Sequence, residues 1–129
     1  MELKERTVER VECECDVYEE NSAEGQVIAI AQRVIGGKWV FVILYLISGG
    51  PTRFSELKRR IPSVSQATLT KQLRMLEEAG LIHREVFPVV PPKVEYTLTD
   101  IGYKFIPVLN ALAEWGDDYT AYLQEQVDK

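Results

Sequence analysis

The stretch SVSQATLTKQLRMLEEAGLI, residues 63–82, has the pattern of a helix with two different faces. Apolar residues recur at i, i+4 and i+7, the spacing of one core-facing side of a helix. These residues are Leu69, Leu73 and Leu76. The same spacing on the other side is occupied by Ala67, Lys71 and Arg74. One face is therefore predicted to be buried, and the other is free to contact something outside the core.

A second, shorter helix is predicted directly before this one. Its apolar stripe consists of Phe54, Leu57 and Ile61, with Thr52 as the predicted N-cap and Pro62 as its end. The longer helix then begins at the N-cap Ser65 and ends at Gly80, which suits the left-handed conformation after a last turn. The connection between the two helices is so short that they must meet at a steep angle, as in a helix-turn-helix unit.

The periodicity changes after Gly80. LIHREVF (81–87) and KVEYTLT (93–99) alternate as strands do, and PVVPP lies between them. We therefore expect a two-stranded hairpin, with Val94, Tyr96 and Leu98 on one face. Three prolines fix φ angles and remove N–H donors, so the tip should be stiff and should not pair with another sheet.

Helices are predicted on both sides of this region. VIAIAQRVI (27–35) has helical spacing and ends at Gly36-Gly37, and KWVFVILYLIS (38–48) is apolar nearly all round, so burial on most sides is expected. Thr99 is the predicted cap of the C-terminal helix, which Pro107 should kink or restart.

The predicted fold class is mainly α with a small β-hairpin wing, a winged helix-turn-helix domain with N- and C-terminal dimerisation helices. The length of 129 residues fits one such domain at 23–129, preceded by a charged arm at 1–22. Within it we expect the helix-turn-helix at about 53–80, the wing at about 81–98 and the C-terminal dimerisation helix at about 99–125.

The charge is distributed unevenly along the chain. The whole chain carries a net charge of −5, but residues 53–95 hold eight basic and five acidic side chains, a net +3, so the remainder carries −8. A basic region between acidic flanks is typical of a nucleic-acid surface whose surroundings repel the same polyanion. The alternative is an ordinary mixed surface.

The outward face of the longer helix fits a DNA major groove, which is about 12 Å wide. There Gln66 and Lys71 could bond bases or phosphates, Arg74 a phosphate or a guanine, and Ala67 a thymine methyl group. Arg84 and Lys93 are expected to flank the tip of the wing. The full set of candidate DNA-contacting residues is Arg53, Ser55, Lys58, Ser65, Gln66, Ala67, Thr68, Thr70, Lys71, Arg74, Arg84 and Lys93. Two alternatives remain open, namely a face that is merely solvated and a protein-interaction module that docks an acidic partner.

The flanking helices carry more apolar surface than a small winged helix needs for its core. The surplus predicts a two-fold interface between copies of the chain. Candidate interface residues are Val27, Ile30, Val34, Leu112, Trp115, Tyr119, Tyr122 and Leu123. The alternative is that the aromatic residues only cap the core of a single chain.

Enzymatic and membrane functions find no support in the sequence. We identify no phosphate loop, no nucleophile–histidine arrangement and no cofactor motif, and a metal site is disfavoured because His83 is the sole histidine. The chain lacks an apolar run long enough to span a bilayer, and its N-terminus lacks an apolar signal core, so we expect a cytoplasmic protein.

Several motifs in order resemble the HxlR-type family of bacterial winged-helix transcriptional regulators, relatives of the MarR group. They are IGGKW (35–39), RFSEL (53–57), LEEAGL (76–81), PPKVEY (91–96) and the Leu98-Thr99…Gly102 pattern. The resemblance covers about residues 27–122. It implies a homodimer that binds double-stranded DNA at an inverted-repeat operator, one helix per half-site, often as a repressor.

The chain departs from this family at positions that bear on regulation. Many members look to have a redox-active cysteine where this chain has Gln26, and a basic residue where it has Ala67. The candidate redox residues are instead Cys13 and Cys15, whose acidic surroundings disfavour the thiolate. A bond within Cys-x-Cys is geometrically poor, whereas a disulfide between subunits remains open. A small-molecule effector is a further candidate, in a dimer-interface pocket lined by aromatic residues around Trp39, Phe41 and Trp115. The alternative is that these residues are part of the core.

Overall fold

The computed structural model describes residues 23–128. In chain order its elements are α1 (Ala23–Ile35), α2 (Val40–Ile47), β1 (Thr52–Arg53), α3 (Phe54–Arg60), α4 (Gln66–Glu78), β2 (Ile82–Phe87), β3 (Lys93–Leu98), α5 (Asp100–Tyr103) and α6 (Ile106–Val127). The chain groups into two compact units, one up to Val40 and one from Phe41 onward, and each is described by itself. Mostly helical structure with a small antiparallel sheet confirms the predicted fold class.

The first unit contains α1. This helix ends at Ile35, directly before Gly36-Gly37, as the sequence predicted. Its apolar side chains are only partly covered, because Ile28 and Val34 are exposed while Val27 and Ile30 are half-buried.

In the second unit, α4 is held by its leucine face. Leu69, Leu73 and Leu76 are almost completely buried, while Ala67, Lys71 and Arg74 are exposed, so the prediction of two faces is confirmed. The remaining fully buried side chains of this unit come from α2, α3 and the sheet, among them Ile43, Leu57 and Ile82. A helix buried on one stripe can take only one rotation about its axis, so this core fixes which residues face outward.

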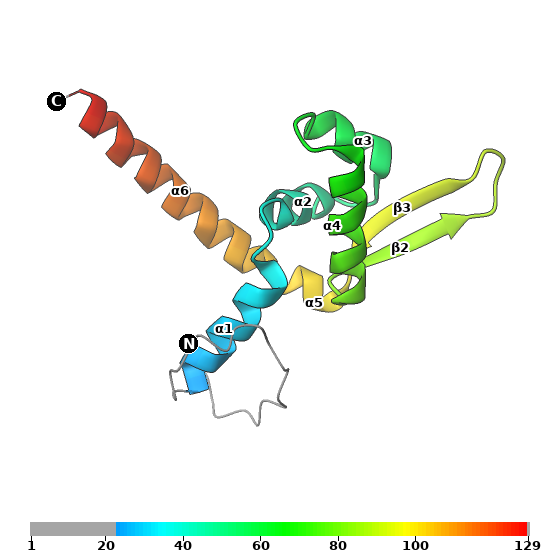
Figure 1. Cartoon of the computed structure of the whole chain (residues 1–129), viewed down its shortest axis with the longest axis horizontal. Helices are drawn as coiled ribbons and strands as arrows, with labels where there is room; N and C mark the ends of the chain where they lie inside the picture. Colours follow the sequence, from blue (N-terminus) through cyan, green and yellow to red (C-terminus); the bar gives the residue numbers. More distant parts are fainter. Residues whose placement is uncertain (1–22, 129) are drawn as a thin grey trace. The chain divides into compact units, whose positions relative to one another are not determined.

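The turn between α3 and α4 is also packed into the core. Ile61 and Val64 are buried, and the Lys58 ammonium group donates a 3.1 Å hydrogen bond to the carbonyl oxygen of Pro62. Ser65 caps α4 as predicted, since its side-chain oxygen accepts a hydrogen bond from the backbone N–H of Thr68. The sequence treated Val64 only as a connection, whereas it anchors the turn. Figure 1 shows α3 and α4 on either side of this turn, with the hairpin of β2 and β3 leading away from the end of α4.

The sheet has three strands rather than two, in the order β1-β3-β2 and all antiparallel. The expected hairpin of β2 and β3 is present, but β1 pairs with the other edge of β3, with Thr52 opposite Tyr96. The prediction that Thr52 caps α3 is therefore wrong. Its hydroxyl group donates instead to the carbonyl oxygen of Gly50, and the N-cap position is taken by Arg53 without a side-chain hydrogen bond. Two residues are too few to show alternation, which is why the sequence did not reveal this strand.

The junction between α4, the wing and α5 is fixed by a small hydrogen-bond network. Gly80 has φ = +83°, the left-handed conformation predicted for it. Thr99 caps α5 by accepting from the N–H of Gly102, and its hydroxyl group donates to the carbonyl oxygen of Gly80. A Cβ atom at Gly102 would overlap the carbonyl oxygen of Leu81, so only glycine allows α5 to approach this closely.

The C-terminal helix is divided in two. Thr99 is its cap as predicted, but α5 ends at Tyr103, and α6 begins at Ile106 with Pro107 in its first turn. Pro107 therefore restarts the helix, one of the two outcomes that were expected, because a proline in the first turn loses no intrahelical hydrogen bond.

Helix α2 differs from its prediction on one side. Ile43, Leu44 and Ile47 are buried, but Val42 is 43% exposed and Tyr45 is 64% exposed. An apolar composition all round predicted burial on most sides. The structure instead packs one face of α2 and leaves these two side chains open.

In the described part of the chain, no single helix has the length and apolar character needed to cross a membrane. Among the described helices, α1 and α2 have the necessary length and apolar composition only if they are counted together across the break between them.

The buried face of α4 gives a direct test of the fold. Leu73→Ala should lower the free energy of unfolding by about 2–5 kcal/mol, because it leaves a cavity in the core. Lys71→Ala, on the exposed face of the same helix, should change it by less than about 0.5 kcal/mol. Urea denaturation of both variants measures these free energies. Equal losses in the two variants would contradict the assignment of a buried and an exposed face.

Candidate nucleic-acid interface

The outward face of α4 is the centre of the candidate interface. Its exposed side chains include Gln66, Ala67, Lys71 and Arg74, and Thr70 is half-buried beside them. The described residues contain no ion pair or hydrogen bond to the side chain of Gln66, Lys71 or Arg74, although the backbone carbonyl oxygen of Gln66 accepts from Thr70. These donors are therefore available to a ligand, which is the arrangement that a DNA-reading helix requires.

The hydroxyl groups at the start of α4 are partly engaged. The Ser65 hydroxyl group donates to the Thr68 hydroxyl oxygen over 2.9 Å, and the Thr70 hydroxyl group donates to the carbonyl oxygen of Gln66 over 2.8 Å. A phosphate near this helix end would meet the remaining donor of Thr68 and the unpaired backbone N–H groups of the first turn.

A shallow cavity of about 290 Å³ lies beside α3. It is lined by Arg53, Ser55, Glu56 and Arg59, and a 3.7 Å ion pair joins Arg59 to Glu56. Arg53 and Ser55 thus lie together as candidate DNA contacts, whereas the ammonium group of Lys58 is used within the turn. Arg59 was not among the predicted contacts. Its ion pair with Glu56 weakens its electrostatic attraction for an anionic ligand.

The two basic residues of the wing differ in position. Lys93 pairs with Phe87 at the tip end of the hairpin, as expected, but Arg84 pairs with Tyr96, three residue pairs further from the tip. The prediction that Arg84 flanks the tip is therefore wrong, because the register places it near α4. The Lys93 ammonium group lies 3.5 Å from a Glu95 carboxylate oxygen and 5.1 Å from the centre of the Phe87 ring. The tip itself exposes Val89 and Val90.

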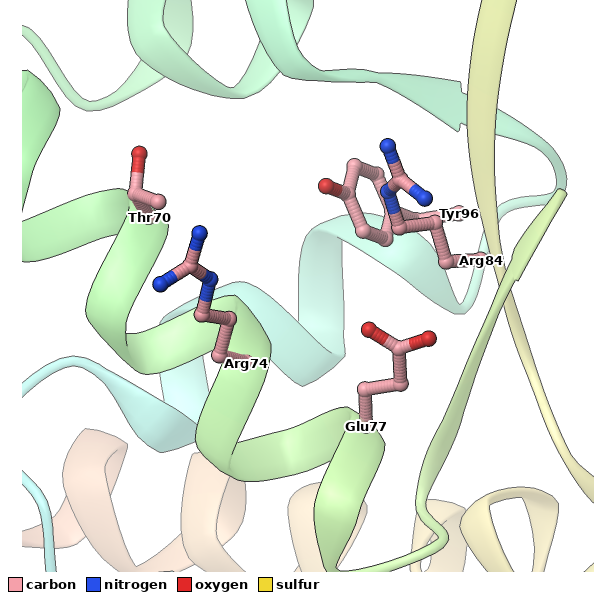
Figure 2. A pocket seen from close by; sticks show the side chains of 5 residues that line it. All are labelled: Thr70, Arg74, Glu77, Arg84 and Tyr96. Carbon is pink, nitrogen blue, oxygen red and sulfur yellow. The ribbon is translucent and has the colours of Figure 1, made fainter. Parts of the chain in front are cut away.

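A second cavity, of about 320 Å³, lies between α4 and the wing. Thr70, Arg74 and Glu77 line it from α4, and Arg84 and Tyr96 line it from the hairpin. Figure 2 shows the polar ends of these side chains around one shared space. Sequence reasoning missed Glu77 and Tyr96 here, since it gave Glu77 no role in binding and placed Tyr96 only on one face of the hairpin. The i, i+3 spacing of Arg74 and Glu77 was the available signal.

A ladder of aromatic rings runs along α6. Trp115 stacks on Tyr119 with ring centres 5.0 Å apart, and Tyr119 stacks on Tyr122 at 5.9 Å. All three rings are exposed, as are Leu112 and Leu123, and Trp115 is 61% exposed. The alternative that these aromatic residues cap the core of one chain is therefore wrong.

The remaining predicted site residues are those of the effector pocket and the two cysteines. Phe41 stacks on Phe105, while the Trp39 ring lies under the ammonium group of Lys38. Cys13 and Cys15 lie outside the described residues. Within residues 23–128, no group of three or more His, Cys, Asp or Glu side chains is arranged to hold a metal ion.

A helix-turn-helix whose second helix presents free polar groups, followed directly by a hairpin, defines a winged-helix DNA-binding protein. The HxlR-like helix-turn-helix family matches residues 34–124, so the chain belongs to this family. The chain is therefore a DNA-binding transcriptional regulator and not an enzyme.

Similar proteins support this assignment. An HTH-type transcriptional regulator of Methanothermobacter thermautotrophicus is 48% identical over 102 residues, which are 79% of this chain and 78% of that protein. The regulator YdeP of Bacillus subtilis is 41% identical over 112 residues, 87% of this chain and 84% of its own. The structure of the redox regulator HypR in its reduced form has a TM-score of 0.73 at 42% identity, covering 77% of this chain and 98% of that one.

Substitutions on α4 and the wing should separate base contacts from phosphate contacts. Lys71→Ala should weaken binding to the operator by about 1–3 kcal/mol and binding to scrambled duplexes much less, if Lys71 contacts a base edge. Lys93→Ala should weaken binding to all duplexes alike and reduce the salt slope by about one unit. Fluorescence anisotropy over a salt series measures both. Unchanged binding in both folded variants would exclude this docking.

Proposed function

We propose that the chain acts as a homodimeric repressor that binds an inverted-repeat operator. Each copy places α4 in the major groove of one half-site and brings its wing to the adjacent backbone. The observation that carries the proposal is the outward face of α4, whose cationic and amide groups are exposed and unpaired above a completely buried leucine face. The other candidate DNA contacts from the sequence include Arg53 at the end of β1 and Ser55 in α3.

The positions of basic residues agree with this proposal. Six of the eight basic side chains of residues 53–95 are exposed, and the other two, Lys58 and Lys93, are half-buried. Because the whole chain is acidic, only this region attracts a polyanion, so the charge distribution selects the orientation of the protein on DNA. An acidic protein partner would also fit the charge, but base-edge groups such as Gln66 have no corresponding role there.

The proposed operator binding is tested with duplexes from the region upstream of the protein's own gene. Binding should depend on sequence and should weaken steeply with salt, because each displaced phosphate counterion contributes to the slope. Scrambled duplexes of equal length are the control. Weak binding that is indifferent to sequence would reject the operator and favour a protein partner.

The dimer is proposed to form through the aromatic ladder of α6, together with the apolar residues of α1. Exposed apolar surface on each of these helices is typical of an interface. A two-fold axis would bring the same surface of both copies together. Leu112, Trp115, Tyr119, Tyr122 and Leu123 supply the α6 part, and Val27, Ile30 and Val34 the α1 part.

Charge placed in the ladder should separate the copies. Tyr119→Glu buries an unpaired carboxylate in the proposed interface, so the protein should become a folded monomer at micromolar concentration. Gln124→Glu adds the same charge on the opposite side of α6 and should leave the dimer intact. Solution scattering gives both masses. A monomeric mass for the unsubstituted protein would itself exclude the dimer.

Oxidation is a candidate signal that releases the operator. HypR, whose structures include an oxidised form with a TM-score of 0.69, is a redox regulator. In this chain Cys13 and Cys15 are the two cysteines, and a disulfide between subunits is the pairing we propose. The operator titration repeated with a thiol oxidant should show loss of binding that the Cys13→Ser/Cys15→Ser double variant resists. A small-molecule effector is the second candidate signal.

A further inference from the structure

The cavity between α4 and the wing is lined by two arginines and one glutamate, and the described residues form no ion pair with either arginine. Arg74 and Arg84 have neither an ion pair nor a side-chain hydrogen bond there, although both line the same space. Figure 2 shows Arg74 extending from α4 and Arg84 from the hairpin, so the two guanidinium groups approach the cavity from different elements. Two guanidinium groups that line one cavity and make no ion pair there favour the binding of an anion.

Tyr96 adds a neutral donor to this pair. Tyr96 is only 8% exposed, so its ring belongs to the core. Its hydroxyl group lines the cavity and makes no hydrogen bond with the described residues. The backbone pairing of Arg84 with Tyr96 fixes both side chains to the same rung of the hairpin. A donor that is held by a buried ring costs little conformational entropy when it binds a ligand.

We propose that this cavity is a pocket for one phosphate group, held between Arg74 and Arg84 and bonded by the Tyr96 hydroxyl group. Guanidinium forks match phosphate oxygens in pairs, and donors from several directions suit a tetrahedral anion better than a planar carboxylate. The cavity of about 320 Å³ leaves room for water beside the phosphate. The Glu77 carboxylate lies at the same cavity, and its negative charge reduces the affinity for any anion.

A phosphate of the DNA backbone and a free phosphate both have this chemistry. The backbone is favoured by position, because the cavity joins the helix and the hairpin that contact DNA in the proposed function. That source rests on the proposed function, whereas the pocket itself does not. A bound backbone phosphate would fix the distance between α4 and the wing on the duplex.

The pocket is tested first without DNA. The full chain is titrated with sodium phosphate at constant ionic strength while the side-chain N–H signals of its arginines are followed by NMR. The signals of Arg74 and Arg84 should shift together and saturate, and that of Arg59 should not. Sodium acetate is the control anion. No saturable shift, or equal affinity for acetate, would overturn the phosphate pocket.

Three variants locate the binding. Tyr96→Phe keeps the buried ring and removes the hydroxyl group, so phosphate affinity should fall about 5- to 10-fold with an unchanged melting temperature. Glu77→Gln removes the repelling charge and should raise the affinity about threefold. Arg59→Gln, outside the cavity, should change nothing. A common effect of all three, or no effect of the first two, would overturn the assignment.

The source of the phosphate is then read from duplexes in which single backbone phosphates are replaced by neutral methylphosphonates. If a backbone phosphate fills the pocket, a methylphosphonate at one duplex position should lower the affinity of the unsubstituted protein for the duplex. The same replacement should not lower the affinity of the Tyr96→Phe variant. Phosphate binding without such coupling would overturn the backbone as the source and support a free phosphate ligand. If the full chain binds free phosphate but binds no duplex, the proposed function is rejected and the phosphate pocket is retained.

Discussion

The burial of three leucines on one face of α4 is the constraint on which the remaining structure depends. Leu69, Leu73 and Leu76 leave that helix a single rotation about its axis, because any other would expose them to water. The same rotation brings Lys71 and Arg74 to the surface together with Gln66. The exposed polar surface that we propose contacts DNA is thus a consequence of core packing, and its polar residues need contribute nothing to stability. A substitution on this surface can therefore change binding while the fold is retained.

The junction after α4 transmits this constraint to the wing. Gly80 reverses the chain in the left-handed conformation, and Thr99 joins the end of β3 to the carbonyl oxygen of Gly80. Gly102 allows α5 to lie against the carbonyl oxygen of Leu81. The hairpin therefore leaves α4 at an angle set by covalent geometry and hydrogen bonds. The cavity between Arg74 and Arg84 exists because both ends of this connection are fixed.

The sequence predicted the features that depend on local periodicity and caps. The faces of α4, the caps Ser65 and Thr99, the conformation of Gly80 and the restart at Pro107 all follow from residues close together in the chain. Features that depend on pairing of distant residues were not predicted. Strand β1 exists because Thr52 meets Tyr96, and Arg84 lies away from the tip because of its register with the same residue. Glu77 and Tyr96 joined the site only when α4 and the hairpin were placed together.

The charge balance of the winged helix gives a reason for pairing two copies. Residues 53–95 have a net charge of only +3, and two of the eight basic side chains, Arg59 and Lys93, are engaged in ion pairs. A single copy therefore makes few phosphate contacts, and its affinity for DNA at physiological salt should be low. In the proposed dimer, binding of the first half-site presents the second at a high effective concentration, so modest contacts add up to stable binding. Because the affinity depends on both half-sites, the complex should be sensitive to any signal that acts on the dimer. A small change in the geometry of the dimer removes the contribution of the second half-site. In the proposed dimer the exposed aromatic ladder of α6 and the few cations of α4 would have complementary roles, with specificity supplied by α4 and affinity by the pairing of two copies.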